Sequence, residues 1–189
     1  MNRLFGERNV TGSTPRRALA AALVVAALGT TGAALTARRT APADDRLAVA
    51  DVVARVAYEA DARDWAAVRT LYADSVRVDY TSLAGGAPAT VAADALIAGW
   101  RELLPGFERT QHMLGPVVVR LDGDRATART HVRALHRIGR EEWIVGGHYT
   151  YQLARRGDEW AITHHTLGGA YQEGNLQLPA LARRRVAER

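Results

Sequence analysis

Apolar side chains recur at helical spacing after residue 43 and predict three helices. The stripe of the first helix has a 3.6-residue period and consists of Val49, Val52, Val53, Val56 and Ala60. Asp64 has the side chain of an N-cap, and the short helix that it begins carries Trp65, Val68 and Leu71. A third helix ends at Pro105 and Gly106 and presents Leu96, Trp100, Leu103 and Leu104 on one side.

Alternation with a period of two predicts strands elsewhere. Val76, Val78 and Tyr80 alternate with polar residues in a short, half-buried strand. Longer strands follow at residues 110–121 (interrupted at Gly115-Pro116), 125–138, 142–155 and 160–171. Helices followed by a meander of antiparallel strands predict an α+β fold, a cone-shaped half-barrel with N-terminal helices packed on a curved, mostly antiparallel sheet. Such a half-closed cone encloses a pocket for a small ligand.

The strand at residues 125–138 shows which side chains face the core. Its even-numbered positions are mostly small and apolar, and they end at His136. Its odd-numbered positions include Arg129, His131 and Arg133. Since side chains alternate between the faces of a sheet, His136 is predicted to point inward and His131 outward, toward solvent or a partner subunit.

Composition restricts the class of protein. Residues 1–43 carry six arginines and one acid, whereas residues 44–189 carry 19 arginines and 19 acids, so the folded part is neutral and nucleic-acid binding is not expected. There is no cysteine and no histidine pair at helical i, i+4 spacing, so neither disulfides nor a metal site are predicted. The chain divides into a leader at residues 1–43, a domain at residues 44–175 and an arginine-rich helix or tail at residues 176–189.

The leader has the pattern of an export signal. Arg16-Arg17 precede an apolar run at residues 18–28, and Ala41-Pro42-Ala43 is a small-x-small cleavage site. We therefore expect export through a Sec or twin-arginine signal. Two alternatives remain: an uncleaved leader that anchors the protein in a membrane through residues 18–37, and a cytoplasmic protein whose start site lies further downstream.

Four polar side chains set into apolar elements form the candidate site: Asp61, Tyr80, His112 and His136. Such groups are costly to bury unless they pair with one another or with a ligand, and together they can move protons on a small molecule. Structural interpretations also exist: an exposed residue before a turn for Asp61, a core tyrosine for Tyr80 and a hydrogen-bonded core histidine for His112. His164 and His165 straddle both faces of the last strand, so at most one of them reaches the pocket.

Several stretches resemble the SnoaL-like group of the nuclear transport factor 2-like superfamily, and within it the scytalone dehydratases. They are Ala-Asp-Ala-Arg-Asp-Trp at residues 60–65, Val-Asp-Tyr at 78–80, Arg-Thr-Gln-His at 109–112 and, more loosely, Leu-His-Arg at 135–137. The resemblance covers most of residues 44–175. It implies the same α+β cone, a small-molecule substrate and no cofactor.

The resemblance also implies roles for the candidate residues. Asp61 orients His112, which carries the proton transfers; Tyr80 helps to hold a water that polarises the substrate carbonyl, and His136 adds a hydrogen-bond donor. Ala60 and Tyr149 stand where these relatives carry a tyrosine and an asparagine, so scytalone itself is not the expected substrate. The candidate substrate contacts are Tyr149, Trp100 and Trp65.

These observations lead to a hypothesis: a cofactor-independent dehydratase or isomerase that uses Asp61 and His112 on a cyclic ketone or polyketide-like molecule, with Tyr80 and His136 steadying the enolate oxygen. One alternative is a non-catalytic, exported ligand-binding or accessory protein of the same fold. Another is a polyketide cyclase or hydrolase with Asp61 as the base. A homo-oligomer, either a dimer or a trimer, is the expected assembly.

Overall fold

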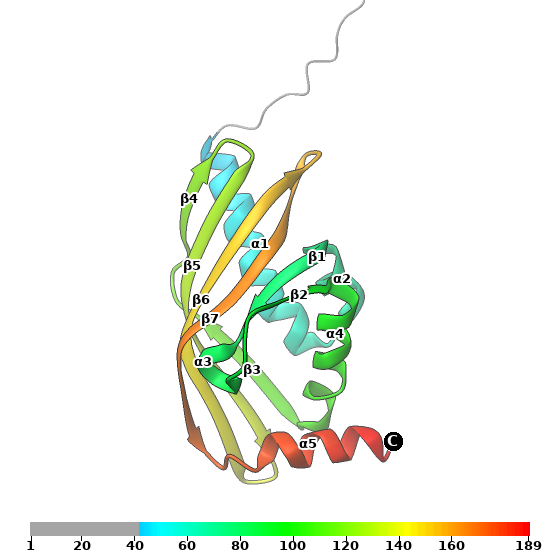
Figure 1. Ribbon diagram of the computed structural model, residues 1–189. Helices are drawn as coiled ribbons and strands as arrows, with labels where there is room; N and C mark the ends of the chain where they lie inside the picture. Colours follow the sequence, from blue (N-terminus) through cyan, green and yellow to red (C-terminus); the bar gives the residue numbers. More distant parts are fainter. Residues whose placement is uncertain (1–41) are drawn as a thin grey trace, which may run out of the picture. The chain divides into compact units, whose positions relative to one another are not determined.

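A strongly curved sheet dominates the computed structural model, which describes residues 42–189 (Figure 1). Within these residues the sheet has seven strands: β1 (Tyr72–Asp79), β2 (Ala89–Ala92), β3 (Arg109–Leu114), β4 (Val118–Asp122), β5 (Arg125–Ile138), β6 (Glu141–Arg156) and β7 (Glu159–Gly174). Their order is β2-β1-β7-β6-β5-β3, and β4 also pairs with β5. Only the pairing of β1 with β7 is parallel, so the predicted α+β fold with a mostly antiparallel sheet is confirmed.

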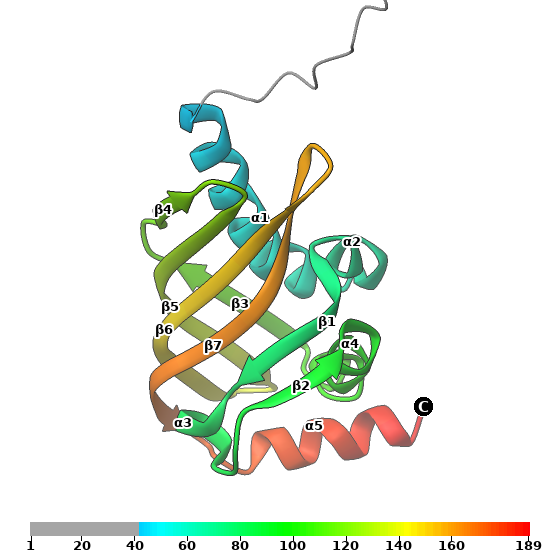
Figure 2. The same ribbon diagram turned by 45° about the horizontal axis from the view of Figure 1, so that its top comes forward.

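Helices cover the concave side of this sheet (Figure 2). They are α1 (Pro42–Ala62), α2 (Trp65–Thr70), α3 (Thr81–Ala84), α4 (Ala93–Arg101), the 3₁₀ turn η1 (Leu104–Gly106) and α5 (Leu178–Ala187). The stripe of α1 is buried as predicted and packs against β3 and β4. None of the helices in residues 42–189 is both long enough and apolar enough to span a membrane. Apart from residues 42 and 43, the predicted leader lies outside the described residues.

The turn between α1 and α2 brings the end of α1 toward η1. Arg63 has a φ of 61°, which reverses the chain, and its guanidinium donates to the carbonyl of Phe107 at 2.6 Å. Asp64 then caps α2 by accepting a hydrogen bond from the amide of Ala67 at 2.9 Å, as predicted. These contacts hold the last turn of α1, which carries Asp61, next to the sheet.

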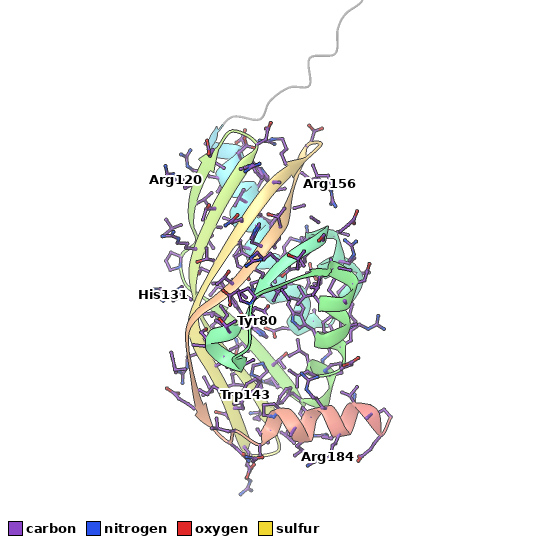
Figure 3. All side chains as sticks on the ribbon, in the orientation of Figure 1. Tyr80, Arg120, His131, Trp143, Arg156 and Arg184 are labelled. Atoms are coloured by element: carbon purple, nitrogen blue, oxygen red, sulfur yellow. The ribbon has the colours of Figure 1, made fainter. Side chains whose placement is uncertain are left out.

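The sheet confirms the predicted direction of the side chains on β5. All even-numbered residues from Ala126 to His136 are buried, whereas His131 is exposed. Figure 3 shows Tyr80 and Trp143 on the side of the helices and His131 on the opposite side. The six even-numbered positions of β5 are buried in an unbroken alternation, and the pairing of β5 with β6 contains no bulge. The alternation of side chains between the two faces therefore holds along the whole strand.

Three predicted elements differ from the observed ones. The strand predicted at residues 110–121 is two strands, because the chain leaves the sheet around Gly115-Pro116 and both parts then pair with β5. Tyr80 is not in a strand but is the first residue after β1 and precedes α3. The short strand β2 was not predicted, since its small, mostly exposed side chains show no buried face.

Candidate active site

A cavity of about 600 Å³ lies on the concave side of the sheet. Apolar side chains make up most of its lining and include Val56, Val78, Leu96, Trp100, Leu103 and Leu167. Polar groups enter it from Tyr80, His112, His136, Tyr149, Tyr151 and His165. Of the described lining residues only Arg183, on α5, carries a permanent charge. The volume is typical of sites that bind small molecules.

Asp61 and His112 form a hydrogen-bonded pair beside this cavity. Oδ1 of Asp61 accepts a hydrogen bond from Nδ1 of His112 at 2.8 Å, and Oδ2 accepts from the His112 amide at 2.6 Å. The carboxylate thus holds both the backbone and the ring of His112. His112 lines the cavity, whereas Asp61 lies behind it and is not among the lining residues. The predicted pairing is therefore present, with Nε2 of His112 left for a ligand.

The environment keeps Asp61 ionised. Burial by itself would raise the pKa of this carboxyl group, but the hydrogen bonds and the charge of His112 outweigh burial and lower the pKa below its usual value. The two hydrogen bonds from His112 also compensate for the unfavourable position of Asp61 near the carboxyl end of α1. An ionised Asp61 accepts from Nδ1 of His112 and so fixes the proton there, which leaves the lone pair on Nε2.

His136 lies on the same face of the sheet, diagonal to His112. Thr110 pairs with His136 and His112 pairs with Ala134, which brings the two imidazole centroids to 5.5 Å. His136 is only 3% exposed and is packed between the rings of Phe107 and Trp143. Burial, followed by the charge of His112, lowers the pKa of His136 to about 3. The ring is therefore neutral at physiological pH.

The hydrogen bond of His136 corrects one expectation. Its Nδ1 lies 3.2 Å from the carbonyl oxygen of Trp143. A carbonyl oxygen can only accept, so Nδ1 carries the single proton of this neutral ring, and Nε2 is an acceptor. His136 was expected to donate to the substrate oxygen, which is wrong for this arrangement, because the backbone of β6 takes up its only proton.

Tyr80 points into the cavity although it lies beyond the end of β1. Its hydroxyl is 3.1 Å from Nδ1 of His165 and 3.5 Å from Nε2 of the same ring. Burial, with smaller effects of Tyr72 and Tyr149, raises the pKa of the Tyr80 hydroxyl well above its usual value. The group therefore keeps its proton and can donate it in a hydrogen bond.

His165 was not among the predicted site residues. It is 1% exposed and is surrounded by the rings of Tyr72, Tyr80, Trp100, Tyr149 and Tyr151. Burial, followed by the charge of His112, lowers its pKa to about 3. The sequence showed only that one of two adjacent histidines at most reaches the pocket; the inward one is His165, opposite Tyr151 on β6 and Val78 on β1.

The three predicted substrate contacts have different positions. Trp100 and Tyr149 line the cavity. Trp65 does not: it is the first residue of α2 and packs, half-buried, against the hydrophobic core. Within residues 42–189, no group of three or more His, Asp or Glu side chains is arranged to hold a metal ion.

Comparison with known proteins agrees with this fold. The SnoaL-like domain family matches residues 41–166, and the chain belongs to this family. The fold is that of the nuclear transport factor 2-like superfamily. A comparison with curated proteins finds no significant match.

Solved structures of similar fold are also found. The Kfla4162 protein from Kribbella flavida is similar at 31% identity, covering 75% of this chain and 98% of that one, with a TM-score of 0.67. A candidate scytalone dehydratase from Novosphingobium aromaticivorans has 19% identity, 70% and 89% coverage and a TM-score of 0.60. A hexachlorocyclohexane dehydrochlorinase from Novosphingobium barchaimii has 15% identity, 71% and 92% coverage and a TM-score of 0.56. The last two similarities concern the fold alone.

Proposed function

We propose that this protein is a cofactor-independent lyase or isomerase that moves a proton next to the carbonyl group of a small, largely apolar cyclic compound. The observation that carries the proposal is the Asp61–His112 pair, whose free imidazole nitrogen faces a cavity of about 600 Å³. The solved relatives whose names include dehydratase and dehydrochlorinase are compatible with this class of reaction, in which a proton and a leaving group are lost.

The first step would be removal of a proton from the carbon next to the carbonyl group. Nε2 of His112 takes the proton, and the electron pair of the broken C–H bond moves onto the carbonyl oxygen, forming an enolate. The Tyr80 hydroxyl donates a hydrogen bond to that oxygen. Asp61 stays ionised and stabilises the imidazolium of His112. The apolar lining keeps water away from the enolate.

The second step decides between the two reaction types. In a dehydration, the enolate electrons expel a hydroxyl group from the next carbon, and the His112 imidazolium protonates it, so that water leaves. In an isomerisation, the imidazolium returns the proton to a different carbon. Nε2 of His136, as an acceptor, can hold a substrate hydroxyl group in either case. In either reaction, the second step returns His112 to its starting protonation state.

The test uses two bicyclic ketones with the full-length chain. 3-Hydroxy-1-tetralone loses water to give fluorescent 1-naphthol, and 1-tetralone reports proton removal by deuterium uptake from D₂O. We expect turnover of the first and exchange in the second. We expect His112→Ala to lower both rates by about 10²–10⁴-fold while the thermal unfolding midpoint stays close to that of the wild type.

His131→Ala is the matched control, because His131 is exposed on the other face of the sheet; it should keep the wild-type rates. An unchanged rate in His112→Ala would contradict the proposed mechanism. If 1-tetralone binds but exchanges no proton, the alternative of a ligand-binding protein without catalysis gains support.

A further inference from the structure

Tyr72 and His165 form a buried pair behind Tyr80. Tyr72 is 0% exposed and is not among the residues that line the cavity. Its hydroxyl lies 2.9 Å from Nδ1 of His165, and the Tyr80 hydroxyl lies 3.1 Å from the same nitrogen. Two hydroxyl groups therefore compete for one ring nitrogen, and only one of them faces the cavity.

The number of available protons and acceptors indicates which of the two hydroxyl groups donates to Nδ1 of His165. Among residues 42–189, the Tyr72 hydroxyl has no hydrogen-bond partner other than His165. If Nδ1 carried a proton and donated it to Tyr72, the proton of the Tyr72 hydroxyl would be buried without an acceptor, at the full desolvation cost of that group. If Tyr72 donates to an unprotonated Nδ1, both groups are satisfied. The second arrangement is the one that a buried site favours.

The same arrangement determines the remaining protons. Aromatic rings surround His165, and no carboxylate within residues 42–189 contacts it, so the ring is neutral and its single proton lies on Nε2. Nε2 is 3.5 Å from the Tyr80 oxygen, but that oxygen is also 3.1 Å from Nδ1, so the in-plane Nε2–H bond does not point at it. The one lone pair of Nδ1 is used by Tyr72, at the shorter distance. The Tyr80 proton is then left to point into the cavity.

We propose that Tyr72 and His165 are positioning residues that direct the Tyr80 proton toward the ligand, so that Tyr80 is a donor while Nε2 of His136 is an acceptor. The two buried histidines then hold opposite tautomers, Nε2–H for His165 and Nδ1–H for His136. A ligand that reaches both sides of the cavity offers an oxygen acceptor to Tyr80 and a hydroxyl or N–H group to His136. The effect on turnover rests on the proposed function; the tautomers do not.

The first test is a ¹⁵N–¹H correlation spectrum of the histidine side chains in the full-length chain without ligand. We expect His165 with an unprotonated Nδ1 and a protonated Nε2, and His136 with the reverse pattern. Substitution of each histidine assigns its signals. A proton on Nδ1 of His165, or a doubly protonated ring at neutral pH, would overturn the proposal whether or not the protein is an enzyme.

The second test measures the hydrogen bond to the ligand by the infrared carbonyl stretch of bound, ¹³C-labelled 1-tetralone. In Tyr72→Phe, the freed Nδ1 of His165 can accept the proton of Tyr80, so the carbonyl group should lose its donor. We therefore expect the stretch in Tyr72→Phe to move to the frequency seen in Tyr80→Phe. Wild-type frequency in Tyr72→Phe would contradict the proposal.

Tyr171→Phe is the matched control for this substitution. Tyr171 lies on β7, and its hydroxyl accepts a hydrogen bond from Arg133 in an exposed position. Its removal should leave the carbonyl frequency at the wild-type value. If Tyr72→Phe does not fold, or if 1-tetralone does not bind, the tautomer spectrum of the wild type still decides the proposal.

Discussion

At the scale of single residues, the site depends on groups that are unfavourable alone and favourable in pairs. Asp61 near the carboxyl end of α1 faces the negative end of the helix dipole. Its contacts with the ring and the amide of His112 compensate for this position and lower its pKa. The same pair gives the base of the proposed reaction its orientation. A change at Asp61 should therefore affect catalysis more than folding.

We predict that Asp61→Asn lowers turnover of 3-hydroxy-1-tetralone by about 10²–10⁴-fold. The asparagine keeps one oxygen, but its NH₂ group faces a second N–H of His112 and cannot accept from it. Steady-state kinetics and a thermal melt check this. Asp64→Asn is the control, since asparagine caps a helix as well as aspartate does; equal rates in the two variants would contradict the role of Asp61.

At the scale of elements, α5 contributes to the cavity although the sequence indicated only a helix or tail there. Leu178 and Ala182 are buried, and Pro179 and Arg183 line the cavity. The contact requires Gly106 in η1, because a Cβ atom at that position would lie 2.0 Å from the carbonyl oxygen of Ala182. The atoms that such a Cβ would meet belong to the backbone of Ala182, which cannot move away by a change of rotamer as a side chain can.

We predict that Gly106→Ala destabilises the protein by about 1–3 kcal/mol and releases α5. Hydrogen exchange should show lost protection at residues 178–187, and the urea midpoint should fall. Gly99→Ala makes the same change in α4, where a Cβ atom meets nothing within 4 Å. That control should be neutral or more stable by up to about 1 kcal/mol. Unchanged protection of α5 in Gly106→Ala would show that the contact is not needed.

At the scale of the whole molecule, the two buried histidines couple folding to pH. The pKa values of His136 and His165 are lowered to about 3 in the folded state, against about 6.5 in an unfolded chain. As the pH falls below about 6.5, the unfolded state takes up protons that the folded state does not. Stability is therefore complete above this pH and decreases toward pH 3.

We predict that the free energy of unfolding decreases between pH 6.5 and 4 by up to about 1.4 kcal/mol per pH unit for each histidine. Urea unfolding at a series of pH values measures this slope. His136→Gln and His165→Gln should each reduce the slope, whatever they do to absolute stability, whereas His131→Gln should not. A flat profile between pH 7 and 4 would show that neither ring is held neutral.

Local patterns predicted most of the elements and some of the site. The inward direction of His136 followed from β5 alone, because strand parity needs no knowledge of the rest of the fold. The pairing of Asp61 with His112 came from a resemblance, since 51 residues separate them in the chain. The prediction that Trp65 contacts the substrate was wrong. An apolar side chain on a short helix can pack against the hydrophobic core or line the cavity, and the sequence does not distinguish the two.

The sequence by itself determined the period of each element, the face that each strand buries and the absence of cysteine. Those properties depend on neighbours a few positions away. The tertiary structure alone decided that His165 rather than His164 enters the cavity and that His136 accepts rather than donates. In the proton arrangement that we propose for Tyr72 and His165, it also leaves the proton of Tyr80 free for a ligand. These outcomes depend on strand register and on which buried partner takes up each proton, and both are set by groups distant in the chain.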